Sequence, residues 1–112
     1  MHVQKMTIRE FINQSPEFQR CIEQGSIDLA YQTFMEGDTN HCSRFLFELT
    51  ELIIRIRKLE TMSQMWRHNE LDFVPFELFE VQLEAMNRYL GVLEARGCTE
   101  KYVAPDNDVR KN

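Results

Sequence analysis

The chain has 112 residues and a formal net charge of −5, and 43% of its residues are hydrophobic. This length fits one domain, and the hydrophobic content excludes global disorder. The acidity disfavours nucleic-acid binding, which depends on neutralising phosphates, and it disfavours docking on anionic lipid. No apolar run approaches the ~20 residues that span a bilayer. The N-terminus also lacks the apolar segment of a secretory signal, so we expect a cytoplasmic protein with no membrane partner.

Three short helices are predicted before the first long one. Residues 7–10 (TIRE) form a capping box, in which a hydroxyl and a carboxylate three residues later satisfy free backbone donors. Ser15 can cap the second helix, and Gly25 is expected to end it. Ser26 is expected to open the third helix and Gly37 to stop it.

Two long amphipathic helices are predicted next, at about residues 40–67 and 75–96, and Asp38 or Thr39 can cap the first. Their apolar residues recur at steps of three and four, and once of seven, which aligns them on one helix face. The two stripes are Phe45, Leu49, Leu52, Ile56, Leu59 and Trp66, and then Phe76, Phe79, Leu83, Met86, Leu90 and Leu93. Because the link is short, we expect the two helices to fold back as an antiparallel hairpin.

The second long helix is expected to end at Gly97, because residues 98–112 carry no periodic pattern. This tail can fold over the bundle through Tyr102 and Val103. The predicted fold is therefore all-α, a bundle of about five helices with short N-terminal helices packed on the long hairpin. We expect one domain over residues 1–97 and a loosely ordered C-terminal tail over residues 98–112.

The first long helix is more apolar than contact with one other helix requires. Its further apolar residues are Leu46, Phe47, Ile53 and Ile54. Such a width indicates neighbours on two sides. The N-terminal helices or a second copy of the protein, in a homodimer, can supply this cover, and the sequence does not decide between them. The stripe of the second long helix is narrow, so one partner helix satisfies it.

The sequence has no arrangement typical of a catalytic, metal or cofactor site. The adjacent His41 and Cys42 lack the CxxC or HxxxH spacing of zinc ligands. No Glu is followed three residues later by His, as a di-iron bundle requires. No Ser lies in a Gly-x-Ser-x-Gly context, and the chain has few glycines for a phosphate loop. We therefore expect no enzyme activity, no metal and no cofactor.

The strongest positive signal is an apolar cluster around the link between the long helices. Its members are Met62, Met65, Trp66, Phe73, Val74, Phe76 and Phe79. Part of this cluster must close the end of the hairpin, and core packing is the alternative for all of it. As an interface, the cluster would use Trp66 as its anchor, because Met and Trp are favoured in adaptable binding surfaces and hot spots. Arg67 and His68 would then form a polar rim.

An acidic face on the second long helix can steer the protein to a basic surface. This face consists of Glu77, Glu80 and Glu84. Together with the apolar cluster it gives the candidate partner-binding residues Met62, Met65, Trp66, Arg67, Phe73, Glu77, Glu80 and Glu84.

The small size, acidity, helical build and missing catalytic constellation are similar, in general character, to small phage-encoded inhibitors and bacterial immunity proteins. Such proteins block a larger enzyme by occupying its surface. The resemblance implies a cytosolic protein-binding module that inhibits or regulates a larger partner. A dimeric helical transcriptional regulator and an assembly adaptor or chaperone are the alternatives. Nucleic acid is disfavoured as a partner because the helix after Gly25 has no basic residue for recognition.

Overall fold

The computed structural model describes residues 5–67 and 76–105, except for the side chains of Trp66 and Arg67. Over these residues the chain forms five helices and no strand, which confirms the all-α prediction. The helices are α1 (Ile8–Gln14), α2 (Pro16–Gln24), α3 (Ile27–Phe34), α4 (His41–Arg67) and α5 (Phe76–Thr99). Among the described helices, none combines the length and apolar character needed to cross a membrane.

The three short helices begin at the predicted caps. The Thr7 hydroxyl accepts the Glu10 N–H at 3.1 Å, and the Glu10 carboxylate accepts the Thr7 N–H at 2.7 Å, which completes the capping box. The side chains of Ser15 and Ser26 accept backbone N–H groups in the first turns of α2 and α3. Gly25 ends α2 with a φ of 60°, in the left-handed region that favours glycine. These ends are local, which is why the sequence predicts them.

The cap of α4 differs from the prediction, because Asn40 holds this position instead of Asp38 or Thr39. The Asn40 side-chain oxygen accepts the Ser43 N–H at 2.9 Å, and the Ser43 hydroxyl accepts the Asn40 N–H at 2.8 Å. The Asn40 amide also donates to the Val103 carbonyl at 2.9 Å. This last bond joins the start of α4 to the segment after α5. The two cap bonds span only three residues, so the sequence carried their signal, whereas the bond to Val103 is long-range.

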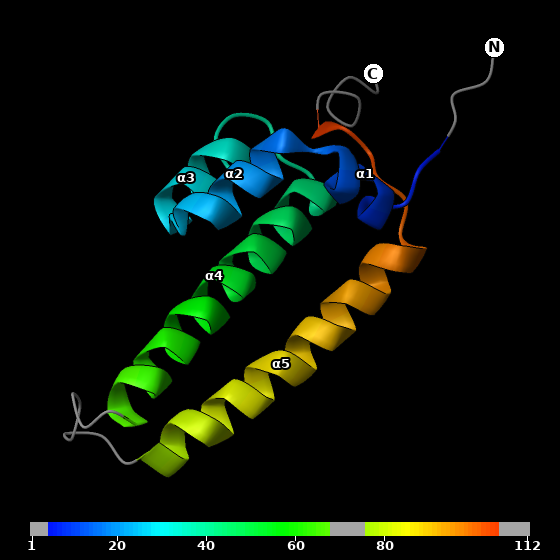
Figure 1. Ribbon diagram of the computed structural model, residues 1–112. Coiled ribbons are helices and arrows are strands. Elements are labelled where there is room, and N and C mark those ends of the chain that lie inside the picture. The colour runs from blue at the N-terminus through cyan, green and yellow to red at the C-terminus, as the bar shows by residue number, and fades with distance from the viewer. Residues whose placement is uncertain (1–4, 68–75, 106–112) are drawn as a thin grey trace.

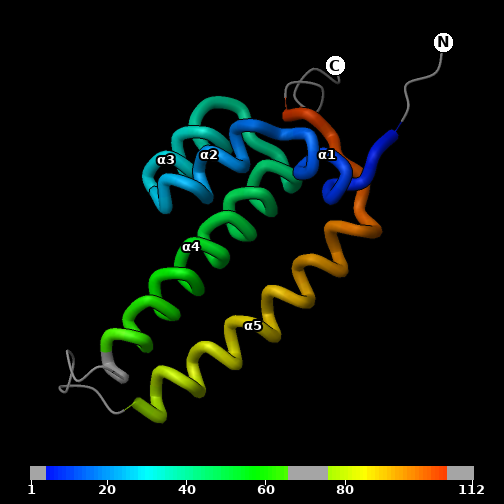
Figure 2. Tube along the Cα trace, viewed as in Figure 1, coloured from blue at the N-terminus to red at the C-terminus, as the bar shows by residue number. Residues whose placement is uncertain are grey.

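Helix α4 is the central element of the fold (Figure 1). Helix α5 packs along one side of it, and α2 and α3 pack on the other side near its N-terminal end. Helix α1 lies against the C-terminal end of α5. Figure 2 shows that α4 and α5 run side by side in opposite directions, as the hairpin prediction requires. The link, residues 68–75, lies outside the described residues.

The core lies where the short helices meet the long hairpin. Its most buried large side chains include Ile8, Leu46, Leu49, Ile54 and Leu93. Leu46 and Ile54 belong to the extra apolar width of α4, and they are buried within the single chain, on a helix against which α2 and α3 pack. For this part of α4, the N-terminal helices therefore supply the cover that the sequence left open.

The C-terminal end of α5 lies beyond Gly97, where we expected the helix to stop. The helix continues to Thr99, and the Glu100 N–H still donates to the Arg96 carbonyl at 2.8 Å. The side chains of Arg96 and Glu100 meet one turn apart, with Nε and Oε2 separated by 2.7 Å. An i,i+4 ion pair of this kind supports a last turn, which explains why the glycine does not end the helix.

The segment after α5 returns along α1. The Tyr102 N–H donates to the Met6 carbonyl at 2.9 Å. The Tyr102 ring stacks on the Phe11 ring, with centroids 3.8 Å apart and planes 5° from parallel. Val103 accepts the bond from Asn40 described above. The first part of the predicted tail thus contacts the bundle through Tyr102 and Val103, whereas residues 106–112 lie outside the described part.

Candidate partner-binding site

The free end of the hairpin, where α4 ends and α5 begins, carries the sequence-predicted site. Met62 and Met65 lie in the last turns of α4 and are exposed. Glu77 and Glu80 lie in the first two turns of α5 and are also exposed. The fold therefore places methionines and carboxylates at the same end of the molecule (Figure 1). The remaining candidates at this end lie outside the description, namely the side chains of Trp66 and Arg67 and the whole of Phe73.

The predicted apolar cluster divides between core and surface. Phe79 is buried and Phe76 is half-buried, and both belong to the α5 stripe predicted to face α4. Met62 and Met65 are exposed on α4. Core packing thus accounts for the described phenylalanines, and the methionines are the described members that a partner can reach.

The three carboxylates of the acidic face have different surroundings. Glu77 lies in the first turn of α5, where the positive end of the helix dipole favours a carboxylate. Glu84 lies further along and pairs with Arg88 at 3.2 Å. Both side chains of this pair are largely exposed, so the pair stabilises the helix only weakly. The negative charge of α5 is therefore concentrated at its N-terminal end, which is the end of the hairpin that also carries the exposed methionines of α4.

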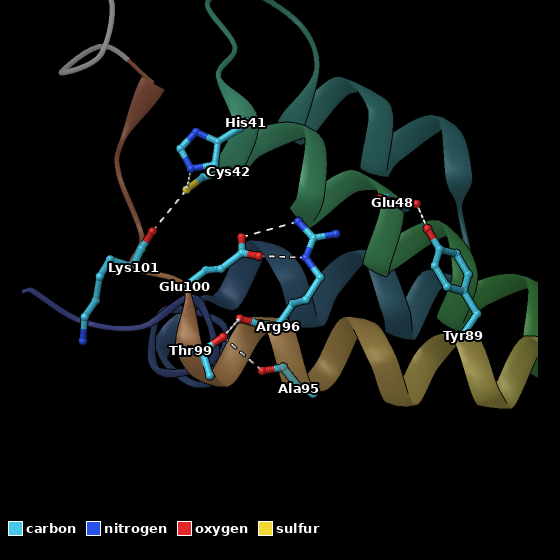
Figure 3. A network of polar contacts seen from close by, with 9 residues as sticks. All are labelled: His41, Cys42, Glu48, Tyr89, Ala95, Arg96, Thr99, Glu100 and Lys101. Carbon is cyan, nitrogen blue, oxygen red and sulfur yellow. Dashed lines mark hydrogen bonds and ion pairs between the residues drawn. The ribbon is translucent and has the colours of Figure 1, made fainter.

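A polar network at the opposite end of the hairpin ties α5 to α4 (Figure 3). The Tyr89 hydroxyl donates to the Glu48 carboxylate, and the Arg96 guanidinium lies 4.7 Å above the centre of the Phe45 ring. The hydrogen bond from Arg96 to Glu100 lowers the pKa of the Glu100 carboxyl and raises the pKa of Arg96. These contacts hold α5 against α4 near the end of the hairpin that the short helices cover.

The neighbours His41 and Cys42 form the arrangement that most resembles a nucleophile with its base, with Nε2 and Sγ 3.5 Å apart. The Cys42 side chain is fully buried. Its Sγ donates to the Lys101 carbonyl and accepts the Val103 N–H, both at 3.4 Å. Reactive cysteines occupy partly exposed positions, whereas the Cys42 sulfur is enclosed. Its two hydrogen bonds join α4 to the C-terminal segment. Over residues 5–67 and 76–105, no group of three His, Cys, Asp or Glu side chains is placed to hold a metal ion.

A second apolar stripe on α5, which the sequence analysis missed, is exposed. We call Leu78, Val81, Ala85 and Val92 the outer stripe. The exposed fractions of Leu78, Val81 and Val92 are 59%, 62% and 56%. The predicted stripe of α5 does face α4, and the outer stripe is an additional apolar face that was not predicted. The signal was present in the sequence, because these residues recur at steps of three, four and seven.

A cavity of about 340 Å³ lies at the end of the molecule that the short helices cover, between α1, the start of α2, the end of α3, the start of α4 and the C-terminal segment. Phe11, Thr33, Phe34, Leu46 and Tyr102 are among its lining residues. No sequence pattern predicts this cavity, because its walls come from five elements of the chain.

Comparison with known proteins gives one family. Residues 39–97 match the sequence profile of the family called Sequestin. The match covers more than half of the chain and includes α4 and all but the last two residues of α5, whereas α1, α2 and α3 lie outside it. The chain matches no curated protein and no solved structure. The family match therefore concerns the long hairpin. Most of the residues that line the cavity lie outside the matched region.

Proposed function

Because the chain belongs to the Sequestin family, we propose that it is a sequestering protein, which holds a larger protein by stoichiometric contact and performs no chemistry on it. The family name describes capture of a partner. The observation that carries the proposal is the extent of the match, because residues 39–97 are the α4–α5 hairpin. By occupying the partner's surface, the protein would act as an inhibitor or regulator.

The free end of the hairpin is the proposed contact surface. Met62 and Met65 are exposed there, and methionine adapts its shape to a partner surface. Glu77 and Glu80 add exposed negative charge beside them. Charge of one sign attracts a surface of the other sign and speeds encounter, so the proposed partner has a basic surface.

The test is affinity capture from a lysate of the source organism, using the tagged full-length chain and two charge-reversed variants. Glu77→Lys/Glu80→Lys reverses the charge at the free end. Glu17→Lys/Glu23→Lys makes the same change in charge on α2, where both residues are exposed and Glu17 also lies in a first turn. Circular dichroism checks that both variants fold.

We expect the wild-type chain and the α2 variant to recover the same protein. The free-end variant should recover roughly tenfold less of it, because reversing charges at an interface slows encounter with an oppositely charged partner. Recovery should also fall as salt is raised. Equal recovery by both variants would exclude the free end as the contact surface. Recovery of DNA, or of no macromolecule, would contradict capture of a protein, and DNA would favour the transcriptional-regulator alternative.

A further inference from the structure

The outer stripe of α5 is an apolar surface that residues 5–67 and 76–105 leave uncovered. Helix α5 packs on α4 and, at its C-terminal end, on α1. Helices α2 and α3 lie on the far side of α4 (Figure 1). Three large aliphatic side chains of the outer stripe are therefore more than half exposed. An aligned apolar surface of this kind marks a docking site, whereas apolar residues scattered singly do not.

The spacing of the outer stripe is that of a helix–helix seam. Leu78, Val81, Ala85, Val92 and Ala95 fall on alternate steps of three and four in a seven-residue repeat. This repeat presents one narrow face to another helix over several turns. Arg88 occupies the remaining position of the repeat, seven residues after Val81, so a partner helix must also accommodate a charge near the middle of the seam.

We propose that the outer stripe packs against the same stripe of a second copy of the chain. The two α5 helices would run antiparallel about a twofold axis that crosses the seam at the level midway between residues 86 and 87. In this register Val81 faces Val92 of the second copy, and Leu78 faces Ala95 of the second copy. The larger side chain then meets the smaller one, which is how facing positions of a helical seam interdigitate. A twofold contact of this kind uses one surface twice.

The charges near the axis are self-complementary in this arrangement. Within one chain, Glu84 and Arg88 already pair at 3.2 Å. An antiparallel partner places its Arg88 beside Glu84 and its Glu84 beside Arg88, so two acids and two bases alternate around the axis. A parallel arrangement would instead bring Arg88 beside Arg88 within the seam, because equivalent seam positions face each other in parallel helices. The charge pattern thus favours a second copy, and it favours the antiparallel direction.

The resulting dimer would place the four long helices in one layer, in the order α4, α5, α5 and α4. The outer stripe is offset by two residues, about 200°, from the stripe that faces α4, so it lies on the opposite side of α5. Because the two α5 helices run antiparallel, the free ends of the two hairpins would point in opposite directions. The dimer inference stands without the proposed capture function, and together they predict two separate contact surfaces per dimer.

Light scattering on a size-exclusion column tests the inference with the full-length chain at micromolar concentration. We expect a mass twice the 13.4 kDa of one chain. Val81→Glu should weaken dimerisation at least tenfold, on the order of a hot-spot substitution. Asn87→Glu adds the same charge to an exposed site of the same helix, away from the outer stripe, and should leave the dimer intact. A wild-type monomer at all concentrations would overturn the inference, and so would equal behaviour of the two variants.

A charge-exchange experiment separates contact between copies from effects within one chain. In a homodimer of Glu84→Arg, all four residues at positions 84 and 88 are basic. In a homodimer of Arg88→Glu, all four are acidic. Each variant alone should be monomeric, and an equimolar mixture should form a heterodimer. Mixing does not change the like charges at positions 84 and 88 within each chain. Association on mixing must therefore come from contact between the two chains. A mixture that stays monomeric would contradict the proposed register.

Discussion

Asn40 joins two distant parts of the chain through one side chain. Its oxygen caps α4, and its amide binds the Val103 carbonyl beyond the end of α5. The side chain is almost fully buried, so losing it would leave backbone groups without partners in a place that water reaches poorly. At the scale of the residue, this contact holds the C-terminal segment against the bundle.

Asn40→Ala should lower the free energy of unfolding by about 1–3 kcal/mol, which is the cost of losing a cap and leaving a buried carbonyl unpaired. Asp38→Ala is the matched control, because Asp38 is exposed and was one of the two predicted caps. Its effect should stay within about 0.5 kcal/mol. Urea denaturation of both variants at one protein concentration measures the difference. A larger loss for Asp38→Ala would show that the cap is assigned to the wrong residue.

The Arg96–Glu100 pair makes a prediction about pH. The hydrogen bond from Arg96 holds the pKa of Glu100 below its usual value. A lowered carboxyl pKa stabilises the folded chain at neutral pH, and this contribution is lost as the pH falls below about 4. Since both side chains are largely solvated, it should not exceed about 1 kcal/mol.

Proton titration of the Glu100 carboxyl by NMR measures this effect directly. We expect its pKa to lie below the ordinary value of a glutamate carboxyl, about 4.3. Glu100→Gln should reduce the fall in stability between pH 5 and pH 3 by a few tenths of a kcal/mol, on the scale of an exposed i,i+4 pair. A Glu100 pKa at or above this ordinary value would mean that the Arg96 contact does not persist in solution.

At the scale of the element, the sequence predicts what depends on nearby residues. The capping box of α1, the serine caps of α2 and α3 and the glycine at the end of α2 all involve residues within one turn. The facing stripes of α4 and α5 follow from their periodicity in the same way. The bond from Asn40 to the Val103 carbonyl joins residues 63 positions apart, so no local preference predicts it. The end of α5 is different, because the Arg96–Glu100 pair lies within one turn and the sequence therefore carries its signal.

The outer stripe was missed for a different reason. Helix α5 carries two apolar stripes, and the one with the aromatic residues Phe76 and Phe79 dominates the pattern. Leu78 and Val81 each follow a glutamate, and Val92 is separated from them by eleven or more positions, so they read as isolated surface positions. Their common face becomes clear once the structure shows which side of α5 meets α4.

The cover of α4 within one chain gives a prediction for this element. Ile54→Ala should lower the free energy of unfolding by about 2–5 kcal/mol, because Ile54 is buried and its truncation leaves a cavity. Lys58→Ala, one turn later and exposed, is the control and should change stability by less than about 0.5 kcal/mol. Chemical denaturation measures both differences.

Protein concentration distinguishes the two sources of cover for Ile54. If α2 and α3 bury this residue, the difference between Ile54→Ala and wild type should not depend on protein concentration. A difference that disappears on dilution would instead place Ile54 in contact with a second copy.

At the scale of the whole molecule, the hairpin has a covered end and a free end. The molecule measures 60 × 25 × 22 Å, and the short helices occupy only one end of its long axis (Figure 1). The sequence predicts a candidate site at the free end, because Met62, Met65, Glu77 and Glu80 lie close together along the chain. It does not predict the cavity at the covered end or the polar network around Arg96, because these bring together segments far apart in the sequence.

The central claim is that the hairpin holds a larger protein without altering it. Native mass spectrometry of the captured complex tests this claim most directly, because it gives the mass of the complex and of each component after release. We predict a complex with equal numbers of the two proteins and a released partner whose mass is unchanged. A partner released with an altered mass, cleaved or modified, would contradict sequestration and assign a catalytic role to the chain.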